Sequence, residues 1–350
     1  MYIDSHVHCR DEEESDKETI KHALSVARDS GVDAIFDIGN LKNKPVTTRQ
    51  RVLDRFELAY AANSPVKYFT YIILTKAKDQ IKEAVETWRE FFPATSNHKV
   101  GVIGLKMFAG QSTGDCGIVT LEEQLEVDEC LVKEGFDGVK AVHCEDETLI
   151  FKDLWDSINP ISHCDVRPER AEIKSIENQI QNYQNVRANY HLEIKHVTTK
   201  QAVDLINSEK NKMRISSEVC VRNLLLDNRV MLGDNGVQYK VNPPLRDEET
   251  RKKLFNCFIR GEIDTLATDH SPHTYQDKKE KNLSGMPGLA SWPDFTEMLV
   301  KKGASWNLID EYAFNRVNQI YRLNIQKLNL PIKRGLHIAE YVIDPFITLK

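Results

Sequence analysis

Short apolar segments rich in β-branched residues alternate along the chain with longer polar, amphipathic segments. The apolar segments have the length and residue preference of buried strands, and the segments between them have the periodicity of surface helices. We predict eight strands, at residues 2–6, 33–38, 67–74, 100–107, 138–143, 190–197, 213–219 and 264–268. We predict helices between them, at residues 17–30, 47–63, 78–92, 121–134, 169–187, 200–208 and 248–260.

This alternation predicts a parallel sheet, and eight repeats over 350 residues predict an α/β fold of the (β/α)8 TIM-barrel type. A doubly wound open sheet is the alternative, but the glycine-rich turn that usually follows its first strand is missing. Residues 287–300 and 307–323 have helical patterns, and residues 336–349 resemble a returning strand. We therefore expect one barrel over residues 1–335 and a short C-terminal tail, 336–350, that packs on it.

Composition and charge limit the classes of function. The formal net charge is −6 and no basic cluster interrupts the chain, so we expect a small-molecule ligand and neither nucleic acid nor an anionic membrane. No apolar run approaches the roughly 20 residues that a membrane-spanning helix needs. Seven cysteines without a CxxC pair indicate reduced thiols, which favours a cytoplasmic protein.

Side chains that can bind metal or move protons occur where the predicted strands end. They are, in chain order, His6, His8, Asn40, Lys106, His143, His196 and Asp269. If the first segment is extended, Asp4, His6 and His8 point to the same face. A lone His-x-His is a weak signal, but four of 11 histidines at strand ends make a stronger one. Because active sites of such barrels lie at the C-terminal strand ends, we predict a metal site there.

Six short motifs in this sequence occur in the order found in one enzyme family. They are His6-Val-His8-Cys-Arg10, Gly104-Leu-Lys106-Met-Phe, Val142-His143-Cys-Glu-Asp, His196-Val-Thr-Thr, Asn242-Pro-Pro-Leu-Arg and Thr268-Asp269-His-Ser-Pro-His273. Together they resemble the dihydroorotases of the amidohydrolase superfamily, from residue 2 to about residue 290. The order of the motifs makes this resemblance far more specific than any one of them.

The resemblance implies a hydrolase with two zinc ions per chain, bridged by a carboxylated lysine. Neutral imidazoles suit zinc, carboxylates bridge, and a pair of metals lowers the pKa of a shared water. Matched position by position, the resemblance implies that His6, His8 and Asp269 bind one metal. It implies that His143 and His196 bind the other metal and that Lys106 bridges the two. The resemblance also makes Asp269 the catalytic residue that carries the proton.

Substrate contacts carry over in the same way. Arg10 and Asn40 resemble the pair that binds the ring carboxylate of dihydroorotate, a role that suits a planar guanidinium. Asn242, His273 and Gly288 occupy the positions of further contacts to the ring and its carboxylate. Ser112 and Thr113 resemble the hydroxyl donors of a mobile loop over the substrate. The implied reaction interconverts N-carbamoyl-L-aspartate and L-dihydroorotate in pyrimidine biosynthesis, and a homodimer is the assembly we expect.

Three segments depart from the family pattern. This sequence has Arg10-Asp-Glu-Glu where the family usually has Arg-Glu-Pro-Gly, and Ile38-Gly-Asn40-Leu41 where the family usually has Met-Pro-Asn-Thr. It has Arg222-Asn223-Leu224 where the family frequently has His-His-Leu. They leave another cyclic amidohydrolase open, namely a hydantoinase, dihydropyrimidinase or allantoinase. Arg10 distinguishes a dihydroorotase from these alternatives, because a ring without a carboxylate gains nothing from a buried guanidinium. A catalytically inactive partner protein is also open, although such a homologue is expected to lose ligands.

Overall fold

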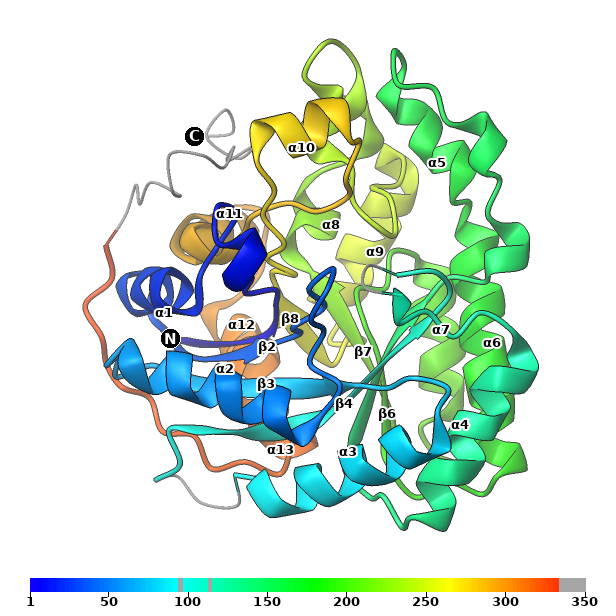
Figure 1. Ribbon diagram of the computed structural model, residues 1–350. Coiled ribbons are helices and arrows are strands. Elements are labelled where there is room, and N and C mark those ends of the chain that lie inside the picture. The colour runs from blue at the N-terminus through cyan, green and yellow to red at the C-terminus, as the bar shows by residue number, and fades with distance from the viewer. Residues whose placement is uncertain (94–96, 113–114, 334–350) are drawn as a thin grey trace.

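The structure is a computed structural model that describes residues 1–93, 97–112 and 115–333 (Figure 1). Parallel strands form one eight-stranded sheet in the order β1 to β8. They are β1 Tyr2–Val7, β2 Val32–Asp37, β3 Lys67–Ile73, β4 Val100–Ala109, β5 Val139–Cys144, β6 His191–Ile194, β7 Ile215–Cys220 and β8 Thr265–Ala267. A parallel bridge between Val7 and His270 joins β1 to the residues after β8. The sheet therefore curves into a nearly closed barrel, which confirms the predicted (β/α)8 fold.

Helices cover the outside of this barrel (Figure 1). Those predicted between the strands are α1 Ile20–Asp29, α2 Arg49–Ala61, α3 Lys78–Phe91, α4 Leu121–Lys133, α6 Glu169–Asn185, α7 Lys200–Glu209 and α9 Glu248–Ile259. In helix α1, Ile20, Leu24 and Ala27 share one buried face, and their helical spacing is the pattern that predicted this helix. The Thr19 side chain accepts a hydrogen bond from the His22 backbone N–H and caps the first turn.

Short helices in the connecting loops were not predicted, because so few residues show no periodicity. They are α5 His163–Val166, α8 Val221–Leu225 and α10 Tyr275–Glu280, with 3-10 turns at Glu12–Glu14, Glu147–Leu149, Lys152–Leu154, Pro160–Ser162, Asn228–Met231 and Gly236–Tyr239. A further 3-10 turn, Leu289–Ser291, lies within the helical pattern predicted at residues 287–300. The predicted tail, residues 336–350, lies outside the described residues. Within the described ranges, no helix has both the length and the apolar character to cross a membrane.

The helices at the C-terminal end of the described chain lie partly on the outside of the barrel and partly at its end opposite the site. They are α11 Trp292–Lys301, α12 Trp306–Asp310 and α13 Arg316–Ile320, with a π-helical turn at Glu311–Asn315. Tyr321, which follows α13, packs edge-on against Phe36 and Tyr71 in a buried cluster inside the barrel. Ile320 lines a hollow together with His191, the first residue of β6. The π-helical turn and α13 thus lie at the N-terminal ends of the strands, whereas α11 packs on the outside of the sheet, and the C-terminal ends of the strands stay open.

Candidate metal and substrate site

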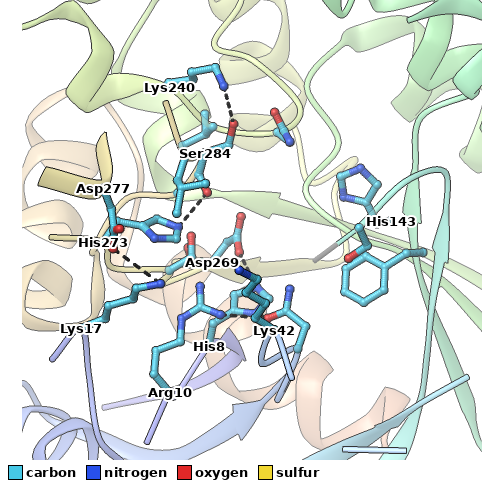
Figure 2. A pocket seen from close by; sticks show the side chains of 18 of the residues that line it. His8, Arg10, Lys17, Lys42, His143, Lys240, Asp269, His273, Asp277 and Ser284 are labelled. Atoms are coloured by element: carbon cyan, nitrogen blue, oxygen red, sulfur yellow. Dashed lines mark hydrogen bonds and ion pairs between the residues drawn. The ribbon is translucent and has the colours of Figure 1, made fainter. Parts of the chain in front are cut away.

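A cavity of about 660 Å³ lies at the C-terminal ends of the strands (Figure 2). The predicted site residues that line it are His6, His8, Arg10, Asn40, Lys106, Ser112, His143, His196, Asn242, Asp269 and His273. Gly288 is not among the lining residues; its backbone N–H donates to His270 Nδ1 at 3.1 Å. Thr113 lies outside the described residues. Residues separated by more than 250 positions in the sequence, such as His8 and Asp269, thus share one cavity.

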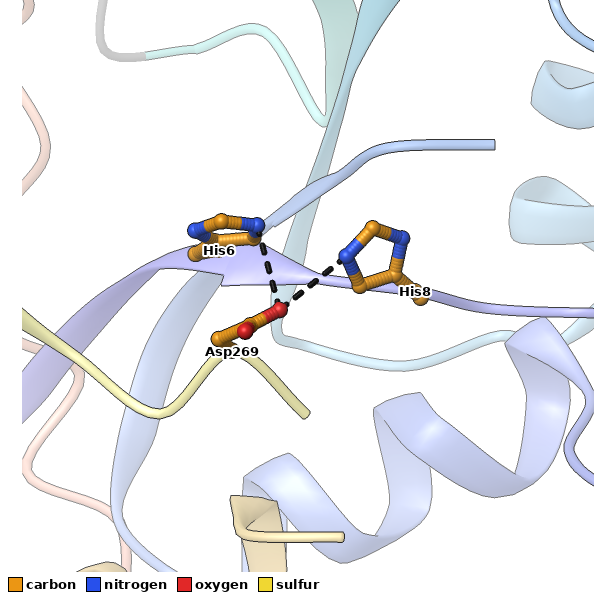
Figure 3. Close-up of side chains that lie close together, drawn as sticks. All are labelled: His6, His8 and Asp269. Atoms are coloured by element: carbon orange, nitrogen blue, oxygen red, sulfur yellow. Dashed lines mark hydrogen bonds and ion pairs between the residues drawn. The ribbon is translucent and has the colours of Figure 1, made fainter. Parts of the chain in front are cut away.

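His6, His8 and Asp269 form a compact cluster (Figure 3). Asp269 Oδ1 lies 3.2 Å from His6 Nε2 and 3.1 Å from His8 Nε2. The other ring nitrogens are already bonded, because His6 Nδ1 lies 2.7 Å from Glu218 Oε1 and His8 Nδ1 lies 2.9 Å from Asn40 Oδ1. These outer partners hold each ring with Nε2 directed at Asp269.

The protonation states of this cluster favour a cation at its centre. His6 Nδ1 faces a carboxylate and His8 Nδ1 faces amide and carbonyl oxygens, so both Nδ1 atoms carry the hydrogen. Burial lowers the pKa of His6 to about 4, so this ring is neutral at pH 7. Two Nε2 lone pairs and the anionic Asp269 oxygen then face one another. Three acceptors at this distance fit a metal ion.

Asp4 does not join the cluster, although the sequence places it on the same face as His6 and His8. Its carboxylate accepts hydrogen bonds from Trp292 Nε1 at 2.8 Å and from the Thr268 backbone N–H at 3.1 Å. Asp4 therefore connects β1 to the residues that follow β8, and its role is structural.

His143 and His196 form the second group of ligand atoms. His143 Nδ1 and His196 Nε2 are 2.9 Å apart, and His143 Nε2 lies 2.9 Å from Glu145 Oε2. Glu145 in turn forms an ion pair with Arg167, so the outer side of His143 is fixed. Burial lowers the pKa of both imidazoles, which keeps them neutral at pH 7. Metal binding requires this state.

The backbone is strained at two of the predicted ligands. His196 has φ 41° and Asp269 has φ 49°, values that residues other than glycine seldom adopt. Each residue lies two positions beyond the end of its strand, β6 or β8, where the chain enters the loop at the C-terminal end of the barrel. Such strain gathers at functional sites because the surrounding structure must hold it in place.

Lys106 reaches the same cavity from β4. It is buried, its Nζ has no hydrogen-bond partner among the described residues, and it lies 5.0 Å from the centre of the Phe108 ring. Burial, with a further contribution from the charge of Lys195, lowers the pKa of Lys106 to about 7. An amine that is partly neutral and unpaired is suited to carbamate formation.

Arg10 and Asn40 lie beside the first cluster. Arg10 Nη1 donates to Asn40 Oδ1 at 3.1 Å, and the same oxygen accepts from His8 Nδ1. Figure 2 shows His143 on one side of the cavity and Arg10 with Lys17 on the other. Asn40 therefore connects a metal-binding ring to a cation that can bind an anionic group of a substrate.

Asn242 and His273 line the cavity from the loops that follow β7 and β8. His163 Nε2 lies 3.0 Å from the Val241 carbonyl and 2.9 Å from Asn242 Oδ1, so this nitrogen donates and the Asn242 NH₂ group is left for a ligand. His273 Nε2 lies 3.0 Å from the Ser284 carbonyl oxygen, and its Nδ1 has no partner among the described residues. Both side chains can thus offer a polar atom to a bound ring.

The sequence analysis missed two buried charged residues of β7 and α8. Glu218 orients His6, and Arg222 forms an ion pair with Asp269 Oδ2 while its Nη1 donates to the Thr268 carbonyl at 3.0 Å. Arg222 stood out only as a departure from the family pattern. A glutamate inside an apolar strand was the available signal for Glu218, because a buried charge needs a partner.

The charges around Asp269 decide its protonation. Burial raises the pKa of Asp269, but the neighbouring His6 and Arg222 outweigh it and hold this pKa well below its usual range. Asp269 is thus an ionised carboxylate with Oδ1 toward the imidazoles and Oδ2 toward Arg222.

The fold is similar to those of cyclic amidohydrolases among solved structures. The L-hydantoinase of Arthrobacter aurescens aligns with a TM-score of 0.80 and 21% identity, covering 95% of this chain and 73% of that one. A dihydroorotase from Saccharomyces cerevisiae, in complex with 5-fluoroorotic acid, aligns with a TM-score of 0.73 and 16% identity, covering 94% of this chain and 85% of that one. No protein-family model matches the sequence.

By sequence the chain is related to the dihydroorotases, as its motifs predicted. It is 31% identical to the dihydroorotase of Thermococcus kodakarensis over 287 residues, covering 82% of this chain and 59% of that protein. It is 29% identical to that of Listeria welshimeri over 303 residues, covering 82% and 64%. It is 26% identical to the dihydroorotase of Staphylococcus epidermidis over 353 residues, covering 97% of this chain and 77% of that protein. The chain thus spans less than two thirds of the length of several relatives.

Proposed function

We propose that this protein is a zinc-dependent dihydroorotase, which interconverts N-carbamoyl-L-aspartate and L-dihydroorotate in pyrimidine biosynthesis. The observation that carries the proposal is the Arg10 guanidinium, which lines the cavity beside His8 and Asp269. Dihydroorotate carries a carboxylate on its ring, whereas the rings of hydantoin and dihydropyrimidine substrates do not require a cation there. The relatives named dihydroorotase support the same choice.

We propose two zinc ions, held by the two groups of ligand atoms and bridged by carboxylated Lys106. When bound, they polarise the ring carbonyl and lower the pKa of the attacking water. Two observations on this chain support the proposal: acceptor atoms of His6, His8 and Asp269 converge, and buried Lys106 has no hydrogen-bond partner within the part of the chain that the structure describes.

The side chains around the metals bind the substrate and transfer the proton. Arg10 and Asn40 hold the ring carboxylate, and Asn242 and His273 bind the ring, with Ser112 and Thr113 as hydroxyl donors from the loop. In the hydrolytic direction Asp269 accepts a proton from the attacking water and delivers it to the leaving ring nitrogen. Because Arg222 donates to Asp269 Oδ2, protonation of this carboxylate weakens the ion pair between them.

The test is a spectrophotometric assay of dihydroorotate hydrolysis by the purified protein, with zinc content measured on the same sample. Hydantoin and dihydrouracil serve as matched rings without a carboxylate. Turnover of dihydroorotate well above both rings supports the proposal, and preference for an uncharged ring would replace it by the hydantoinase alternative. Bound zinc with no turnover of any ring would indicate an inactive homologue.

A cytoplasmic location and a homodimeric assembly complete the proposal. The seven cysteines form no disulfide, which agrees with thiols in a reducing compartment. Light scattering on the purified protein tests the assembly, and fractionation of the source cells tests the location.

A further inference from the structure

Arg55 is a residue of the outer helix α2 whose side chain is fully buried, with 0% exposure. Its guanidinium reaches the segment that follows β1. Nη1 donates to the carbonyl oxygen of Arg10 at 2.7 Å, and Nη2 donates to the carbonyl oxygen of Cys9 at 3.0 Å. One planar group therefore holds two successive backbone carbonyls, immediately after the predicted ligand His8.

Asp37, the last residue of β2, completes this arrangement. Its Oδ2 lies 2.7 Å from Arg55 Nη2, and its Oδ1 accepts a hydrogen bond from the Cys9 backbone N–H at 2.8 Å. Tyr68 donates to the same carboxylate and accepts from Arg55 Nε at 3.3 Å. The Cys9 peptide groups are thus held at both N–H and C=O by a fully buried ion pair.

The Arg10 side chain depends on this backbone more than on its own contacts. Among the described residues its guanidinium has one hydrogen-bond partner, Asn40 Oδ1, and its buried Nε has none. The chain then turns sharply, because Asp11 and Glu12 have φ 73° and 54°. The direction in which Arg10 points is therefore set by the backbone that Arg55 holds.

The predicted metal ligands nearby have restraints of their own. His8 Nδ1 is bonded to the Ile38 carbonyl and to Asn40, and the His8 backbone N–H donates to the His270 carbonyl at 2.7 Å. His6 is held by Glu218. Loss of the Arg55 contacts would thus loosen Arg10 while the metal cluster stays in place.

We propose that Arg55 is a positioning residue that acts through Arg10: it fixes the guanidinium that receives the substrate carboxylate, and so sets the affinity for carboxylated rings. This inference deepens the proposed function and rests on it. A misplacement of a substrate-binding group by about 1 Å can cost up to a hundredfold in rate or affinity. A helix on the outside of the barrel would thereby help to decide which rings bind inside it.

The test is Arg55→Lys, which keeps a cation beside Asp37 but lacks the two separate nitrogens with which the planar guanidinium reaches the two carbonyl groups. We expect KM for dihydroorotate to rise about tenfold or more, with kcat and zinc content near those of the wild type. Asp37→Asn weakens the same contacts from the other side and should raise KM in the same way. The control is Asp128→Asn, which removes a buried ion pair with Lys140 far from Arg10; it should lower the melting temperature and leave KM unchanged.

A double-mutant cycle with Arg10→Gln shows whether Arg55 acts through Arg10. In the Arg10→Gln background, Arg55→Lys should cause no further rise in KM. The weakening of orotate binding, an unreactive ring with the same carboxylate, should follow the same pattern. Equal rises in both backgrounds, or a wild-type KM in Arg55→Lys, would overturn the inference alone. A wild type that neither hydrolyses dihydroorotate nor binds orotate would overturn the proposed function, and this inference with it.

Discussion

At the scale of single residues, we expect Arg10 to decide which ring the cavity accepts. Arg10→Gln keeps a hydrogen-bond donor but removes the charge, so it should cost roughly 1.5–3 kcal/mol of substrate binding or transition-state stabilisation. Zinc content should not change, because the ligand atoms belong to other side chains. Steady-state kinetics with metal analysis measures both. Normal turnover of dihydroorotate by Arg10→Gln would exclude the carboxylate role.

In the proposed mechanism Asp269 both ligates a metal and carries a proton. Asp269→Ala should abolish hydrolysis and weaken one metal. Arg222→Met keeps the carboxylate but removes the ion pair to Oδ2, so we expect reduced activity with zinc still bound. Rates and zinc affinity of both variants give the comparison. More than about a tenth of the wild-type rate in Asp269→Ala would assign the proton to another group.

Lys106 distinguishes a two-metal site from a simpler one. Unmodified lysine cannot bridge two cations, whereas its carbamate offers two oxygens. We expect Lys106→Ala to lose at least one zinc ion and most of the activity. Metal analysis, and a high-resolution map of the zinc-loaded wild type, check this expectation. An unmodified Lys106 that points away from the metals would refute the bridge, whatever the substrate.

At the scale of elements, Glu18 connects the start of helix α1 to the segment after β8. Its carboxylate lies 2.6 Å from His22 Nδ1 and 3.1 Å from His270 Nε2. Burial raises the pKa of Glu18, but these hydrogen bonds outweigh it and lower the pKa from 4.5 to about 2. A depressed carboxylate pKa stabilises the folded state above the unfolded value and loses this effect as pH falls.

We therefore expect the contribution of Glu18 to be complete above pH 4.5 and to disappear as pH falls toward 2. Glu18→Gln should be less stable than the wild type at pH 6 and should lose less stability between about pH 4.5 and pH 3. Urea unfolding at these pH values measures the difference. Exposed Glu57→Gln on helix α2 is the control, and the same pH dependence in Glu18→Gln and the wild type would contradict the assignment.

At the scale of the whole molecule, the predicted metal ligands come from five parts of the barrel. They lie on or directly after β1, β4, β5, β6 and β8. Zinc bound there would connect strands on opposite sides, so removing it should lower the melting temperature. A ligand present at a hundred times its Kd stabilises the folded state by about 2.7 kcal/mol. Thermal unfolding after chelation, and again after zinc is restored, tests this; identical melting curves would argue against a metal that joins the strands.

The sequence by itself determined the fold and most of the candidate ligands. Strand and helix patterns are local, because each element buries one face and its periodicity is written in consecutive residues. Eight repeats of this pattern permit few topologies, and the barrel geometry then brings strand ends such as His6, His143 and Asp269 together. The domain boundary at residue 335 stays a prediction.

Only the tertiary structure decided which buried charges surround those ligands. Glu218 beside His6, Arg222 beside Asp269 and Arg55 behind Arg10 are contacts between residues 45 to 212 positions apart. No local pattern encodes such pairs, since each partner alone is only an improbable charge in an apolar element. Folding removes these charges from water and leaves them stable only where an opposite charge or hydrogen-bond partner arrives from another part of the chain.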